Sequence, residues 1–156
     1  MKKIDWKNLS YYDFIGFVAV TAILLFALYF GGLWYATYDY RIQMRDQMVG
    51  MYQQLPEPLP VVSEDYGVHQ RWLVFYIDGV KILNKPQPEN VINEYKKALE
   101  KEGWDAEREY VRNDKNKTYG VNMRKGEFIL SVSARENRDS INIHLIKRDW
   151  IYNKGF

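Results

Sequence analysis

The chain has 156 residues, which leaves room for one domain of ordinary size plus an appendage but not for two enzymatic domains. Lys and Arg number 22 and Asp and Glu number 20, an excess too small for the clustered positive charge that nucleic-acid binding requires. Cysteine is absent, so disulfides, thiolate metal ligands and cysteine nucleophiles are excluded.

The first element in the chain is an apolar segment that predicts a transmembrane helix over 14–38. No charged residue occurs from Phe14 to Tyr38. As a helix this run would be about 37 Å long, and the hydrocarbon core of a bilayer is about 30 Å thick. A cleaved signal peptide needs a shorter apolar stretch, and the rest of the chain is too small to wrap a buried core helix of this length. We therefore expect a retained membrane anchor.

The charges beside this helix predict its direction. Lys2, Lys3 and Lys7 lie in the short tail 1–13, whereas Arg41 and Arg45 follow the helix. Positive residues favour the cytoplasmic side. We therefore expect a single-pass protein of the cytoplasmic (inner) membrane, with the N-terminus in the cytoplasm and the domain 60–156 outside it.

Small residues recur at four-residue spacing within the apolar segment. They are Ala27 with Gly31, and Gly32 with Ala36. Such spacing lets two membrane helices approach backbone to backbone, although glycine is also common in membrane helices without a packing role. These four residues are the predicted helix-packing site, and a partner in a hetero-complex is favoured over a second copy of this chain. The segment carries no Asp, Glu, Lys, Arg or His, so it offers no transport chemistry of its own.

The juxtamembrane segment 39–59 predicts an amphipathic helix followed by a spacer. Its apolar stripe, taken as a candidate partner-contact surface, consists of Met44, Met48, Met51 and Leu55, with Tyr52 as an alternative to Met51. The chain's own domain, a partner subunit or the lipid surface would have to cover this stripe. Prolines at 56, 58 and 60 end any helix and indicate a stiff extended spacer.

The soluble domain begins near Pro60 with a strand and a helix. Residues 71–77 form a β-branched and aromatic run, followed by Asp78 and Gly79 and then by the apolar residues 80–83. This pattern predicts either a tight hairpin or one strand with a bend. Pro88 then starts a helix with one apolar face that ends at Gly103. Trp104, directly after that glycine, is expected in the core.

Alternating apolar and polar residues predict the remaining strands, over 119–123, 128–134 and 141–145. Their short connections require antiparallel neighbours, so we expect an α+β domain in which one helix packs on a meander sheet. The opposite face of that sheet would be polar and the favoured place for recognition. It would carry Asn122, Arg124, Ser131, Ser133, Asn142 and His144.

The sequence contains no pattern of a catalytic, cofactor or metal site. His69 and His144 are the chain's two histidines, and no metal-binding motif accompanies them. We therefore expect no enzyme, no cofactor and no nucleic-acid partner. The leading hypothesis is a non-enzymatic accessory or assembly subunit of a larger membrane protein complex, with the lipid bilayer and membrane proteins as partners. The alternative is a membrane-anchored module that binds an extracytoplasmic ligand.

Overall fold

The computed structural model describes residues 11–71, 73–84, 86–113 and 115–148. The lysines of the expected cytoplasmic tail, Lys2, Lys3 and Lys7, lie outside these residues. The chain forms two compact units, Met1–Arg41 and Ile42–Phe156. Most of the juxtamembrane segment thus belongs to the same compact unit as the sheet.

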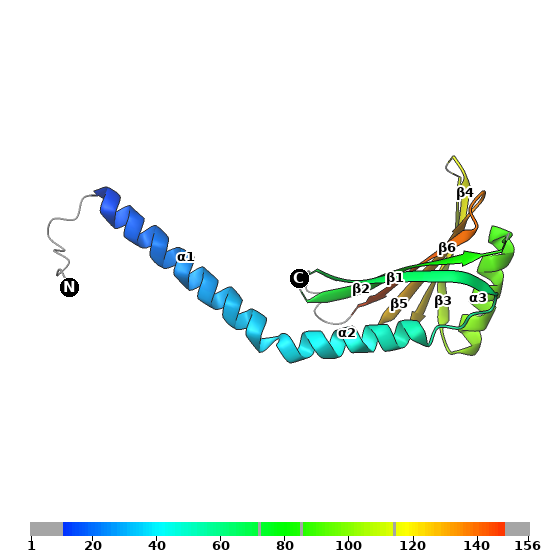
Figure 1. Ribbon diagram of the computed structural model, residues 1–156, viewed down its shortest axis with the longest axis horizontal. Coiled ribbons are helices and arrows are strands. Elements are labelled where there is room, and N and C mark those ends of the chain that lie inside the picture. Colours follow the sequence, from blue (N-terminus) through cyan, green and yellow to red (C-terminus); the bar gives the residue numbers. More distant parts are fainter. Residues whose placement is uncertain (1–10, 72, 85, 114, 149–156) are drawn as a thin grey trace. The chain divides into compact units, whose positions relative to one another are not determined.

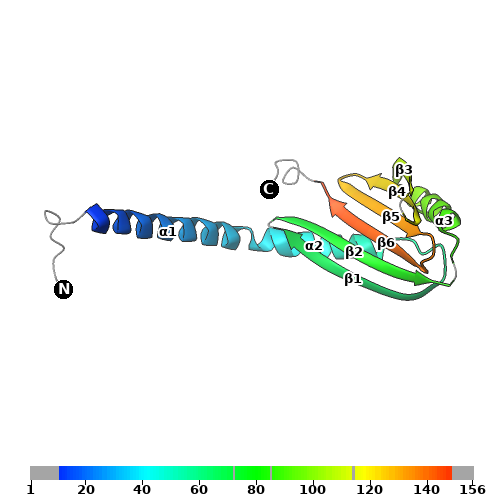
Figure 2. The ribbon, with the colours of Figure 1, turned by 90° about the horizontal axis from the view of Figure 1, so that it is seen from above.

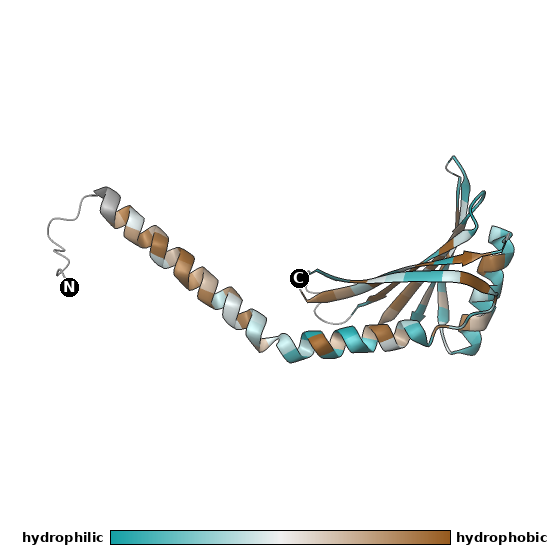
Figure 3. Ribbon diagram, viewed as in Figure 1, coloured by the Kyte–Doolittle hydropathy of each residue, from teal (hydrophilic) through white to brown (hydrophobic). Residues whose placement is uncertain are grey.

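The first unit is built on helix α1, Tyr11–Ala36 (Figure 1). From Phe14 to Ala36 this helix is long and apolar enough to cross a membrane. Hydrophobic residues predominate along this helix (Figure 3). Most of its large apolar side chains are exposed, as with Leu28, which is 71% exposed. The last turn of α1 is capped by Thr37 and Arg41, whose side chains donate to the carbonyls of Leu33 (2.9 Å) and Trp34 (2.8 Å).

The second unit combines two helices with a six-stranded sheet, which confirms the predicted α+β class. Its elements are α2 Tyr38–Gln53, β1 Val61–Arg71, β2 Val74–Leu83, α3 Pro88–Lys101, β3 Asp105–Asn113, β4 Lys117–Lys125, β5 Phe128–Arg135 and β6 Ser140–Lys147. Every pairing is antiparallel, in the order β1-β2-β6-β5-β4-β3 (Figure 2). The sheet therefore has two edges, β1 and β3.

Helix α3 forms as its sequence predicts. Pro88 occupies the first turn, where a missing N–H costs nothing, and Glu89 complements the positive end of the helix. The chain leaves the helix at Gly103, whose φ of +80° suits glycine. The N–H of Trp104 then donates to the carbonyl of Leu99, and its side chain is buried at 3% exposure. The prediction that Trp104 lies in the core is confirmed.

One face of the sheet is apolar and forms the core. Ile77, Leu145, Leu130 and Met123 are direct neighbours on β2, β6, β5 and β4, and all four are buried. Helix α3 contacts β3, β4 and β5 on this face. Helix α2 covers the β1 and β2 side, where the side chain of Tyr52 lies against Gly79. Two helices therefore share the face for which the sequence predicted one.

Strand β2 runs without interruption through Asp78 and Gly79, so the hairpin alternative is wrong and one strand spans this dipeptide. Both residues have places in the sheet that explain this. Asp78 pairs with His144 on β6, and Gly79 provides space for Tyr52. The start of the predicted run at residue 71 was wrong, because Arg71 ends β1 and β2 begins at Val74. Strands β1 and β3 were not expected. Both are edge strands with mostly exposed side chains, and β3 is irregular between Ala106 and Arg108.

Candidate functional site

The face of the sheet opposite the helices carries a continuous row of polar side chains. Register places one residue from each of five adjacent strands side by side: Asp78, His144, Ser131, Asn122 and Arg108. We call this set the polar row. Three of its members, Asn122, Ser131 and His144, were predicted from the sequence to lie on the polar face. Adjacent strands are about 4.8 Å apart, so the row extends across most of the sheet.

Both histidines of the chain converge on one carboxylate at the β2 end of the polar row. Nδ1 of His144 lies 2.6 Å from Oδ1 of Asp78, which is hydrogen-bond distance. Nε2 of His69 lies 3.7 Å from Oδ2 of the same residue. The ring of Tyr76 lies between the imidazoles, with centroids 5.0 Å from His69 and 5.5 Å from His144. We call these four residues the histidine cluster.

The local fold explains why these side chains meet. His69 and Tyr76 are directly paired across β1 and β2, and Asp78 and His144 are paired across β2 and β6. Gly67 has no side chain, and the imidazole of His69 leans into the space that a Cβ atom there would need. The sequence predicted His144 on the polar face of the sheet and assigned no role to His69. Register decides their proximity, and no sequence motif signals it.

Solvent reaches the histidine cluster freely. The side chains of His69, Asp78 and His144 are 49%, 54% and 44% exposed. Electrostatic interactions are weak where water has access, so the arrangement suits hydrogen bonding to a ligand better than general acid–base catalysis. Over the described ranges, no group of three or more His, Cys, Asp or Glu residues is placed to hold a metal ion.

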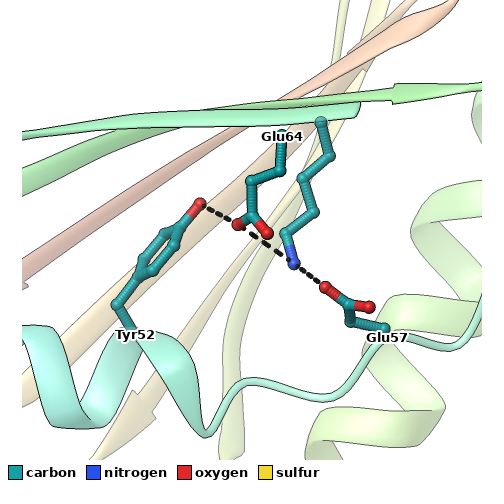
Figure 4. A network of polar contacts seen from close by, with 4 residues as sticks. Tyr52, Glu57 and Glu64 are labelled. Carbon is teal, nitrogen blue, oxygen red and sulfur yellow. Dashed lines mark hydrogen bonds and ion pairs between the residues drawn. The ribbon is translucent and has the colours of Figure 1, made fainter. Parts of the chain in front are cut away.

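The helix-covered face holds a second polar group, in which Lys81 pairs with two glutamates. Figure 4 labels its other members, Tyr52, Glu57 and Glu64. The ammonium of Lys81 is buried at 3% exposure and lies 2.6 Å from Glu57 and 3.3 Å from Glu64. The phenol of Tyr52 donates to Glu64 at 2.8 Å. We call Tyr52, Glu57, Glu64 and Lys81 the lysine network. It links the end of α2 and the proline-containing spacer to strands β1 and β2.

Burial raises the pKa of two tyrosines, Tyr52 of the lysine network and Tyr95. Desolvation raises the pKa of the Tyr52 phenol, and its hydrogen bond to Glu64 raises it further. Desolvation also raises the pKa of Tyr95, with smaller contributions from the charges of Glu57 and Glu64. The Tyr95 hydroxyl is buried and has no hydrogen-bond partner within the described part of the chain. The lysine network therefore has a structural role. Lys81 of β2 holds Glu57 of the spacer and Glu64 of β1, and Glu64 in turn holds Tyr52 of α2.

The predicted juxtamembrane stripe lies largely inside the second unit. Met44, Met48 and Leu55 are buried at 6%, 0% and 8% exposure, and Met51 is half-buried. Of the three kinds of cover, the chain's own domain accounts for the burial of these residues. Lys147 on β6 also donates to Gln47 of α2 at 3.2 Å. The partner-contact role of the stripe stays a prediction.

The predicted helix-packing residues all lie on the surface of α1. Ala27, Gly31, Gly32 and Ala36 are exposed, and a Cβ atom built at either glycine would meet nothing within 4 Å. Another helix could therefore approach these positions, and their role in packing stays a prediction.

Comparison of this chain with protein-family models, curated proteins and solved structures finds no match.

Proposed function

We propose that this chain is a non-enzymatic, single-pass accessory or assembly subunit of a larger membrane protein complex. The observation that carries the proposal is the surface of α1. None of its most apolar stretch is buried within the chain. A helix with so much apolar surface needs lipid or other apolar helices around it.

Features of the second unit support an assembly role. Helix α2 follows α1 after a single residue, Thr37, and its buried methionines and the lysine network join it to the sheet. The interaction domain of such a subunit thus includes its juxtamembrane helix. The exposure of the histidine cluster also favours a binding surface over a catalytic centre.

Site-specific cross-linking in the native membrane tests the assembly role. A photoreactive amino acid replaces Gly31, which lies on the face of the Ala27–Gly31 pair, and in a matched variant it replaces exposed Phe26, which points away from both small-residue pairs. We expect a discrete cross-linked membrane protein from position 31 and diffuse lipid adducts from position 26. A full-length protein that runs as a lone monomer in mild detergent, with no cross-link from either position, would contradict the proposal.

The direction of insertion has its own test, because the chain has no cysteine. The variant Ser63→Cys places one thiol on exposed strand β1. A membrane-impermeant maleimide should label it in intact cells if the domain lies outside the cytoplasm. Labelling that requires lysis would reverse the proposed orientation, which rests on three lysines before the helix against two arginines after it.

A second candidate function is capture of an extracytoplasmic ligand on the polar face of the sheet. The histidine cluster favours it, because an aromatic ring flanked by two imidazoles and a carboxylate offers stacking and hydrogen bonds in one place. Thermal unfolding of the full chain in detergent, with and without soluble cell-envelope extract, provides the measurement. A ligand should raise the midpoint for the natural chain and not for the double variant His69→Ala/His144→Ala. Equal midpoints for both proteins would count against this function.

A further inference from the structure

We propose that the β3 end of the polar face is a binding site for an oxyanion, either a carboxylate or a phosphate group. A hollow of about 250 Å³ lies there. It is lined by Arg108, Tyr110, Val111, Arg112, Asn122 and Ser131. We call it the arginine hollow. The inference is independent of the proposed assembly role.

The two arginines of the hollow lack carboxylate partners among the described residues. The acidic residues beside Arg108 in the sequence are engaged elsewhere, because Glu107 pairs with Arg124 at 3.3 Å and Glu109 pairs with Lys96 on the helix-covered side. A guanidinium without a carboxylate partner retains its full set of donors. Within the described ranges, the β3 end of the polar face therefore presents two guanidinium groups that no carboxylate pairs.

The amide of Asn122 is oriented so that it adds a donor. The hydroxyl of Ser131 donates to Oδ1 of Asn122 at 2.7 Å, which occupies the amide oxygen. The Nδ2 group is then the part of Asn122 that remains for a ligand. Two guanidiniums and an amide N–H form a set of donors, and charge-assisted bonds from such donors to an oxyanion are among the strongest in proteins. A neutral or cationic ligand would leave these charges unmatched.

Gly120 and Tyr110 determine where the guanidinium of Arg112 lies. The ring of Tyr110 lies over Gly120, where the ring atoms fill the space that any side chain would need. Glycine in the middle of a strand costs stability, and here it leaves room for the outer end of an aromatic ring against the sheet. The guanidinium of Arg112 stacks over that ring, 5.3 Å from its centroid. Gly120 and Tyr110 thus act as positioning residues for Arg112.

Nuclear magnetic resonance of the full chain in detergent micelles tests this site. The Arg Nε–Hε signals are followed while sodium phosphate or sodium acetate is added at constant ionic strength, with sodium chloride as the reference. We expect the Arg108 and Arg112 signals to shift together and saturate with at least one of the two oxyanions. Saturation with phosphate alone identifies a phosphate site, and saturation with acetate a carboxylate site. Shifts that do not saturate, or that chloride reproduces, overturn the proposal.

Variants separate the site from general surface charge. The double variant Arg108→Gln/Arg112→Gln should weaken binding about tenfold or more, since each charged hydrogen bond contributes strongly. Arg138→Gln removes an exposed arginine in the β5–β6 turn and should leave affinity unchanged. Gly120→Ala should displace Tyr110 and weaken binding about two- to fivefold, the share expected of one exposed cation–π contact. Equal weakening in Arg138→Gln, or none in the double variant, contradicts the assignment.

Discussion

The phenol oxygen of Tyr52 occupies the space in which a side chain at Gly79 would begin. Tyr52 lies in the last turn of α2, and Gly79 lies in the middle of β2. The centroid of the same ring lies 4.8 Å from that of Tyr66, with the two rings tilted, and its hydroxyl donates to Glu64. The packing of α2 on the sheet therefore requires glycine at position 79, in addition to the buried methionines of α2.

The substitution Gly79→Ala is expected to destabilise the second unit. A methyl group there overlaps the Tyr52 phenol, so the ring must move and lose its hydrogen bond to Glu64. Overpacking of this kind costs about 1–3 kcal/mol. Denaturant unfolding of the full chain in detergent, followed by tryptophan fluorescence, measures the loss. Adding Tyr52→Phe removes the overlapping oxygen and should recover part of the stability.

Gly50→Ala is the matched control, because a Cβ atom at this helical position meets nothing within 4 Å. It should stabilise α2 by roughly 0.5–1 kcal/mol, since alanine has the higher helix propensity. If Gly79→Ala were as harmless as Gly50→Ala, the close approach of Tyr52 would not be maintained in solution.

Alkaline pH should destabilise the second unit through its buried tyrosines. The pKa values of Tyr52 and Tyr95 are raised above 10 in the folded chain, chiefly by desolvation. Above pH 10 the unfolded chain binds fewer protons at these sites than the folded chain does. Stability is therefore complete below pH 10 and falls as pH rises, by up to about 1.4 kcal/mol per pH unit for each tyrosine.

Comparison with Tyr52→Phe isolates one of these contributions. Unfolding free energies measured at pH 9, 10 and 11 should fall less steeply for the variant than for the natural chain. Lysines also titrate in this range, but both proteins contain the same lysines. Parallel pH curves for the two proteins would mean that Tyr52 is not desolvated in the folded state.

Lys81→Met should destabilise the domain even though methionine fills a similar volume. The ammonium is buried between Glu57 and Glu64, and its loss leaves two carboxylates facing each other. Breaking a fully buried pair costs about 3–5 kcal/mol, but Glu57 is 51% exposed and keeps contact with water, so we expect about 2 kcal/mol. Chemical unfolding measures the difference, and Glu57→Gln with Glu64→Gln in the same chain should restore part of it.

The exposed pair of Lys97 with Glu94 provides the comparison for Lys81. Lys97→Met should change stability by no more than about 0.5 kcal/mol, because water screens an exposed pair on a helix. Equal effects of the two substitutions on stability would show that Lys81 is solvated and that the lysine network does not stabilise the domain.

Local patterns were enough to predict much of the fold. The apolar run of α1, the capped apolar face of α3 and the alternation in β5 each appear in consecutive residues, so propensity and periodicity identify them. Strands β1 and β3 escaped prediction because edge strands lack a buried face on which apolar residues alternate. The role of Asp78-Gly79 was ambiguous because the same dipeptide can form a turn or can lie within a strand where the glycine makes room for an aromatic ring.

The candidate sites were harder to predict because register assembles them. His69, Asp78 and His144 lie on three different strands, and their proximity follows from pairings that a single sequence does not specify. One usable signal was present. Isolated glycines within strand patterns, such as Gly79 and Gly120, indicate close approach of another group, and each lies beneath a tyrosine ring.

Gly31→Ile should disrupt assembly without preventing membrane insertion. A branched side chain at this position keeps a second helix from approaching the backbone of α1, whereas its apolar character favours the bilayer. Gly16→Ile is the matched control, because a Cβ atom there also meets nothing within 4 Å, but Gly16 lies outside the pairs Ala27–Gly31 and Gly32–Ala36. Both variants should resist extraction by alkaline carbonate, and only Gly31→Ile should lose its co-purifying membrane partner in mild detergent. Retention of the partner by Gly31→Ile would exclude the face of the Ala27–Gly31 pair as the contact, and release of either variant by carbonate would remove α1 as the anchor.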